Sequence, residues 1–171
     1  DDGARYYEMF SSLTDEARLL TTLDNDSQRI FPQVAEETVP PSRRQLEQTV
    51  DDLAAQIEAD REAGRQSELY LIFTGHGDVD DSGEGYLSLM DSKLYRSDLY
   101  RDIVEPLNAD YTHLIVDACH AYFMVHSRGA GEEWRDDRSG RTLDEQVDAY
   151  LAEGESEESQ TRPTVGVIVS T

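Results

Sequence analysis

The sequence predicts an α/β fold, with a mostly parallel central sheet and helices on both of its faces. Three short apolar runs, at residues 69–73, 114–116 and 164–169, are rich in β-branched and aromatic side chains, which is typical of buried parallel strands. Helical patterns alternate with these runs, as in doubly wound sheets. The length of 171 residues suits one domain with a substantial core.

The N-terminal third predicts a helix, a strand and an irregular connection, over residues 4–13, 16–23 and 24–41. Apolar side chains recur at helical spacing in the first segment and form a short run in the second. The third contains turn-forming residues and the pair Pro40-Pro41. The defining residues are Tyr7, Phe10 and Leu13 for the helix, and Ala17, Leu19 and Leu20 for the strand.

A long amphipathic helix is predicted next, before the first apolar run. Ser42 followed three residues later by Gln45 has the form of a capping box, which marks a helix start. Gly64 marks the end. Between these two points, apolar residues recur at helical spacing, at Leu46, Val50, Leu53 and Ile57.

The segment between the first two apolar runs predicts a hairpin and a second helix. Residues 78–85 form an acidic, glycine-containing loop, residues 86–89 alternate like a short strand, and Ser97 is expected to cap a helix through Leu107. The loop resembles the first half of an EF-hand. Its twelfth position is Leu89 and not the glutamate that binds calcium, so an exposed hairpin loop is predicted.

The C-terminal part changes in composition after the second apolar run. Residues 128–141 are charged and glycine-rich, residues 143–151 predict one amphipathic helix, and residues 153–162 are polar and acidic, as mobile segments are. The last strand, residues 164–169, carries valines on one face and Ile168 on the other. Further sequence is expected to cover it, because apolar faces avoid water.

Charge and cysteine content exclude several classes of function. With 37 acidic and 15 basic residues, the formal net charge is −22, which disfavours nucleic acid and anionic membranes as partners and favours basic ones. Salt adaptation is an alternative cause of the charge. One cysteine excludes a disulfide framework and fits a reduced cytoplasm. No apolar run is long enough to span a membrane.

Two short motifs at the ends of the first two strands carry the candidate chemistry. They are Thr74-Gly75-His76-Gly77-Asp78 and Asp117-Ala118-Cys119-His120. Parallel neighbours would bring His76 and Cys119 to the same sheet edge, where open α/β sheets bind ligands. A thiol beside an imidazole is a nucleophile beside a base. Alone, Cys119 would be a packing residue and His76 a structural histidine.

These motifs resemble the caspase-like cysteine peptidases, and within that group the metacaspase pattern. The resemblance implies that residues 1–171 are the larger, p20-like portion of a three-layer α/β/α catalytic domain, incomplete at both ends, whose cleft a second chain or a p10-like portion completes. It implies an endopeptidase that cleaves after Arg or Lys and needs no cofactor, although some metacaspases depend on calcium. The implied residues are His76 and Cys119 for catalysis, the Gly77 and Cys119 amides for the oxyanion, and Asp117, Thr74 and Asp1 or Asp2 for the basic side chain.

Other roles for these residues stay open. Asp117 would oppose thiolate formation, and as an alternative to substrate binding it caps a turn. His113, His120 and His126 show no metal-ligand spacing. The rival function is an inactive caspase-like scaffold that binds basic partners through its acidic surface.

Overall fold

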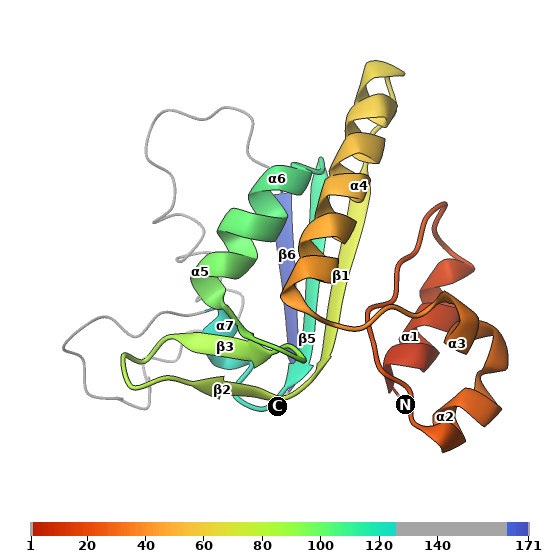
Figure 1. The fold of residues 1–171 in the computed structure, drawn as a ribbon. Helices are drawn as coiled ribbons and strands as arrows, with labels where there is room; N and C mark the ends of the chain where they lie inside the picture. The colour runs from red at the N-terminus through yellow and green to blue at the C-terminus, as the bar shows by residue number, and fades with distance from the viewer. Residues whose placement is uncertain (1, 126–163, 171) are drawn as a thin grey trace.

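The computed structural model describes residues 2–125 and 164–170. Its centre is a parallel three-stranded sheet in the order β1-β5-β6 (Figure 1), formed by β1 (Glu68–Gly75), β5 (Tyr111–Ala118) and β6 (Thr164–Ser170). All three strands were predicted from their apolar runs, and both pairings are parallel. The α/β class with a parallel sheet is therefore confirmed.

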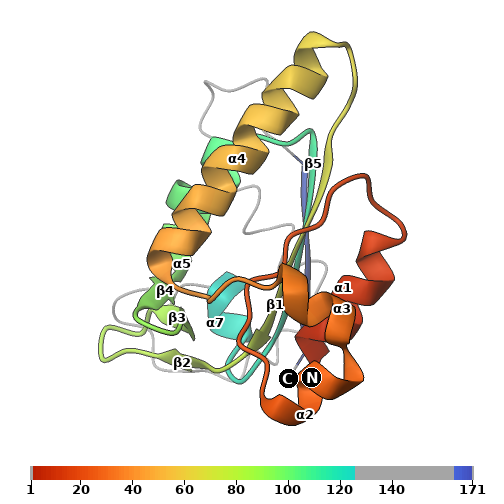
Figure 2. The ribbon, with the colours of Figure 1, turned by 45° about the vertical axis from the view of Figure 1, so that its right-hand side comes forward.

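One face of this sheet carries the main apolar core. Along β5, Leu114 and Val116 are almost completely buried, whereas His113 and Ile115 at the alternate positions are partly exposed, because successive strand residues point to opposite faces. Helices α4 (Arg43–Glu62), α5 (Arg96–Leu99) and α6 (Glu105–Leu107), with the π-helical turn η1 (Tyr100–Val104), lie on this side (Figures 1 and 2). The fully buried members of the core are Val50, Leu87, Leu94, Leu99, Ile103, Leu107, Leu114, Val116, Ala118, Ala121 and Met124.

The long helix α4 has the predicted start and end. The Ser42 hydroxyl accepts a hydrogen bond from the Gln45 N–H at 3.3 Å, which satisfies one of the free donors of the first turn. After the helix, Gly64 has a φ of +75°, a left-handed conformation that glycine adopts without steric cost.

The second helical segment begins differently from the prediction. Ser97 is not its cap: the helix starts at Arg96, and the Asp98 carboxylate accepts the backbone N–H of Tyr95 at 3.2 Å. The Ser97 N–H donates to Glu84 on the hairpin. The predicted end at Leu107 is confirmed. Pro106 cannot donate to the carbonyl four residues earlier, and η1 lies directly before this disturbed part of the helix.

The opposite face of the sheet is covered beside β1 by α1 (Asp2–Ser11), α2 (Asn25–Ile30) and α3 (Pro32–Glu37) (Figure 1). These helices enclose a second, smaller apolar cluster. The ring of Phe10 on α1 lies 5.2 Å from the ring of Tyr70 on β1, centroid to centroid. The predicted first helix is confirmed with shifted ends. The buried residues of the cluster are Ala4, Leu23, Phe31 and Val34.

Two predictions for this N-terminal part are wrong. Residues 16–23 form no strand, since only Leu20 makes a single bridge, to Val39; Leu19 and Leu23 pack in the helical cluster instead. Residues 24–41 contain α2 and α3 and are not an irregular connection. The Asp24 carboxylate caps α2 by accepting the Ser27 N–H at 2.7 Å, and capping of this kind starts short helices that have little apolar periodicity.

A small antiparallel sheet follows β1, in the order β2-β3-β4. It consists of β2 (Gly77–Val79), β3 (Gly85–Ser88) and β4 (Lys93–Tyr95). The predicted hairpin strand is confirmed, and the acidic loop is shorter than predicted because its first residues form β2. Asp80 closes the loop by accepting the backbone N–H groups of Ser82 and Glu84, as aspartates do in tight turns.

The last strand differs between its two faces. Val167 packs against the main core, whereas Ile168 is 63% exposed. The predictions for residues 128–141, 143–151 and 153–162 lie outside the described residues. Within the described ranges, the helices are too short or too polar to cross a lipid bilayer.

Candidate active site

The parallel register brings the two motifs to the same edge of the sheet. Thr74 is paired with Asp117 and Gly75 with Ala118, so His76 and Cys119 directly follow a pair of register partners. Both of their side chains are exposed. The prediction that His76 and Cys119 leave the sheet at one carboxyl edge is therefore confirmed.

Gly77 makes the closest backbone approach between the two motifs. A Cβ atom at this position would lie 2.6 Å from the carbonyl oxygen of Cys119 and 3.3 Å from the Cβ of Ala118. The first of these contacts is with backbone, which cannot rotate away as a side chain can. Glycine is required here because any other residue would force the two segments apart.

The hairpin leaves the N–H of Gly77 without a partner on β3. Gly77 is opposite Leu87, and the Ser88 N–H donates to the His76 carbonyl at 2.8 Å. This bond flanks the Gly77–Leu87 pair, so that pair is of the non-hydrogen-bonded type, in which the N–H groups point away from the neighbouring strand. The donor that the family resemblance assigns to the oxyanion is thus not used by the β2–β3 ladder.

Cys119 lies in a tight turn at the end of β5. The Ala121 N–H donates to the Ala118 carbonyl at 3.2 Å, and His120 has a φ of +60°, a left-handed conformation that is uncommon for residues other than glycine. The short helix α7 (Tyr122–Val125) follows. This turn lifts the thiol out of the strand, where it is exposed to solvent.

The imidazoles at this edge are not hydrogen-bonded to the thiol. Among the described residues, no hydrogen bond joins His76 to Cys119. His120 instead has its Nδ1 atom 3.9 Å from a carboxylate oxygen of Asp78 on β2. In unliganded cysteine enzymes the bond between nucleophile and base is often long and tightens only when substrate binds, so the arrangement is compatible with a dyad.

A hollow of about 350 Å³ brings together two of the predicted substrate-binding carboxylates. Asp2 on α1 and Asp117 on β5 both line it. Thr74, the third predicted residue, is the register partner of Asp117, and Asp1 lies outside the described residues. The other lining residues, which no motif in the sequence marks as site residues, are Arg5, Tyr6 and Met9.

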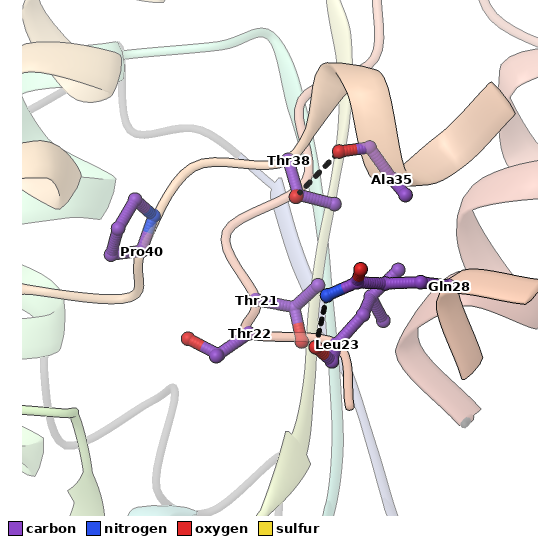
Figure 3. A pocket seen from close by; sticks show the side chains of 7 residues that line it. All are labelled: Thr21, Thr22, Leu23, Gln28, Ala35, Thr38 and Pro40. Carbon is purple, nitrogen blue, oxygen red and sulfur yellow. Dashed lines mark hydrogen bonds between the residues drawn. The ribbon is translucent and has the colours of Figure 1, made fainter. Parts of the chain in front are cut away.

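A second, smaller hollow, of about 190 Å³, lies among the N-terminal helices (Figure 3). Two of its polar side chains bond to nearby backbone: the Gln28 amide donates to the Leu23 carbonyl at 2.9 Å, and the Thr38 hydroxyl donates to the Ala35 carbonyl at 3.3 Å. Its lining includes no residue of the two motifs. The full lining is Thr21, Thr22, Leu23, Gln28, Ala35, Thr38 and Pro40.

The remaining histidines do not form a metal site in the described part of the chain. His113 has its Nε2 atom 2.8 Å from Glu68 and is stacked on Tyr70, which is a structural role. The Tyr70 hydroxyl donates to the same carboxylate; this bond lowers the pKa of Glu68 and raises that of Tyr70. Across residues 2–125 and 164–170, no three His, Cys, Asp or Glu side chains are arranged to hold an ion. His126 lies outside these ranges.

Comparisons of this chain with protein-family models, with curated proteins and with solved structures find no match. The chemistry assigned to this sheet edge therefore rests on the two motifs, the parallel register that unites them and the contact of Gly77 with Cys119.

Proposed function

We propose that this chain is the catalytic portion of a caspase-like cysteine endopeptidase that cleaves proteins after Arg or Lys. The observation that carries the proposal is the register of β1 and β5, which delivers an exposed imidazole and an exposed thiol to one sheet edge. A packing cysteine would be buried, as most free cysteines are. Cys119 is exposed.

In the proposed mechanism, His76 takes the proton of the Cys119 thiol, and Sγ attacks the scissile carbonyl carbon. The tetrahedral intermediate collapses to a thioester as His76 protonates the leaving amine, and water activated by His76 then releases the acid and restores the thiol. The backbone N–H groups of Gly77 and Cys119 stabilise the oxyanion. The free direction of the Gly77 N–H supports this role.

The preference for a basic side chain is proposed for the hollow beside this edge. Asp117 and Asp2 line it, and a carboxylate pairs favourably with a guanidinium or ammonium group. Asp117 is two residues before Cys119, so a side chain bound there belongs to a residue close to the scissile bond. The net charge of −22 favours approach of basic substrates.

The wider proposal is a caspase-like three-layer sandwich that works in a reduced compartment such as the cytoplasm, without a cofactor. In the described strand order β6 is an edge strand, and an edge of this kind can pair with a further strand, which supports a second chain or p10-like portion beside it.

The direct test is cleavage of fluorogenic peptides that differ only in the residue before the scissile bond. Together with the proposed p10-like portion, wild type is expected to cleave after Arg and Lys and not after Asp. Cys119→Ala and His76→Ala should each lose at least about a hundredfold in activity, as expected for groups that act as one unit. His113→Gln, far along β5 from the edge, is the matched histidine control and should stay active.

The second candidate is an inactive scaffold that binds basic partners. It is favoured by the absence, among described residues, of a hydrogen bond between His76 and Cys119. An arginine-bearing electrophilic peptide separates the two candidates: an enzyme is labelled at Cys119 faster than it is by the same electrophile without arginine, and a scaffold is not.

A further inference from the structure

One side of α1 faces the hollow beside the candidate active site. Its four lining residues, Asp2, Arg5, Tyr6 and Met9, follow the spacing of a single helical stripe. This stripe is separate from the side of α1 that packs into the N-terminal cluster, where Ala4 and Tyr7 lie. The helix therefore holds the fold together with one side and shapes a cavity with another.

The hollow contains a positive charge as well as two negative ones. Arg5 lines it together with Asp2 and Asp117, which leaves one negative charge in excess among the three. Arg5 is exposed, and among the described residues its guanidinium is not part of an ion pair. Within residues 2–125 and 164–170 no partner fixes its guanidinium, which is a cation beside the two carboxylates.

We propose that Arg5 is a specificity-determining residue of this hollow: a resident cation that an incoming basic side chain must displace or tolerate. The inference rests on the proposed function in that the hollow receives the basic side chain of the substrate. A second cation beside Arg5 is repelled, while the carboxylates attract it. Tyr6 and Met9 supply apolar wall for the aliphatic stem of the incoming side chain.

Binding in the hollow therefore favours cations that carry an aliphatic stem as well as a positive charge. A compact cation without a stem is attracted only by the net negative charge of the hollow, and Arg5 reduces that net charge to half of the charge of the two carboxylates alone. A Lys or Arg side chain also buries its stem against Tyr6 and Met9 and so compensates for the repulsion. Removal of the charge at Arg5 is expected to strengthen the binding of both kinds of cation, because the repulsion acts on the charge that they share, and so to raise the preference of the hollow for cations over neutral side chains.

The test is calorimetric titration of the full chain with n-butylguanidinium, which carries a single guanidinium on an aliphatic stem, and with guanidinium ion alone. At low salt, Arg5→Gln should bind n-butylguanidinium about three- to tenfold more tightly than wild type, the effect of one unit charge a few ångströms away in a water-like dielectric. Arg5→Lys keeps the charge and should stay within about twofold of wild type. The gain should shrink at 1 M salt, where the screening length is about 3 Å.

The matched control is Arg29→Gln, which removes the same charge from the exposed ion pair with Asp26 on α2. Equal gains in Arg5→Gln and Arg29→Gln would show only a change of net charge and would overturn the proposal. So would unchanged or weaker binding of n-butylguanidinium by Arg5→Gln, or no binding of it by either protein. If cation affinity rises in Arg5→Gln but no peptide is cleaved, the proposed peptidase activity is refuted and this inference is not. If peptides are cleaved after Arg at a rate that does not change in Arg5→Gln, this inference is refuted and the peptidase activity is not.

Discussion

Gly77 lies against the backbone carbonyl of Cys119 so closely that a single methyl group at position 77 would be 2.6 Å from the oxygen. The contact joins the strand end that carries His76 to the strand end that carries Cys119. The separation of the two backbone segments that carry the imidazole and the thiol is thereby set by backbone packing.

Gly77→Ala is expected to lose both stability and activity. The added Cβ must push backbone away from backbone, and overpacking of this kind costs about 1–3 kcal/mol. Urea unfolding and peptide cleavage measure the two effects. Gly166→Ala on β6 is the control: its Cβ would meet only the His113 ring at an ordinary 3.5 Å, so stability should rise by about 0.5–1 kcal/mol. An active, fully stable Gly77→Ala protein would contradict the proposed oxyanion geometry.

The thiol of Cys119 should be alkylated by iodoacetamide several-fold faster in the native protein than in urea, because it is exposed and, in the proposed dyad, lies beside an imidazole. A nearby imidazole that accepts the thiol proton increases the fraction of reactive thiolate. His76→Ala should therefore slow alkylation several-fold at pH 7, while His113→Gln should not. Equal rates in wild type and His76→Ala would show that the two side chains do not cooperate.

Asp110 should stabilise the protein in a pH-dependent way. Its carboxylate accepts hydrogen bonds from the backbone N–H of Ser67 at 2.7 Å and from the Ser67 hydroxyl at 3.0 Å, and these bonds lower its pKa. A lowered pKa in the folded state gives a contribution that is complete above the unfolded pKa of about 3.9 and disappears as the pH falls through the folded value.

Asp110→Asn is therefore expected to be less stable than wild type in urea at pH 7 and pH 5, and the difference should shrink below about pH 4. Asp26→Asn, which changes an exposed carboxylate on α2, serves as the control and should show little difference at any pH. A gap between Asp110→Asn and wild type that widens in acid would have the wrong sign for this mechanism.

Thr112→Val should stabilise the protein. Thr112 is 1% exposed, and within the described part of the chain its hydroxyl has no hydrogen-bond partner, a condition that costs about 1–3 kcal/mol. Valine has the same shape without the hydroxyl, so a gain of about 1 kcal/mol is expected in urea unfolding. Thr112→Ser keeps the hydroxyl, loses a methyl group and should be less stable by about 0.8 kcal/mol. Destabilisation by valine would mean that the hydroxyl is bonded in solution.

The sequence was sufficient for the elements that have strong periodic or capping signals. The strands and α4 combine apolar patterns with clear ends, such as Ser42 and Gly64. The parallel pairing of β1 and β5 followed from the fold class. That pairing in turn predicted that His76 and Cys119 lie at the same edge of the sheet. Helices α2 and α3 were missed because six residues each are too few to show a helical period.

Features that depend on tertiary contact could not be predicted. The spacing of residues 16–23 suits a strand, but no neighbouring strand is available for pairing, and Leu19 and Leu23 pack with helices. Arg5 could not be predicted as a site residue from the sequence of α1, because only the fold places it in the same hollow as Asp117 of β5. The buried hydroxyl of Thr112 likewise has no signature in the sequence.

The division of buried side chains into two clusters affects how the protein can change over generations. Cys119 and Gly77 depend on the cluster beneath α4, whereas Arg5 belongs to a helix anchored in the other cluster. Substitutions on the exposed stripe of α1 can accumulate without weakening the packing that holds the thiol in place. A duplicated copy could thus acquire a preference for a different substrate side chain through a few substitutions on α1, while the residues of the proposed catalytic site stay unchanged.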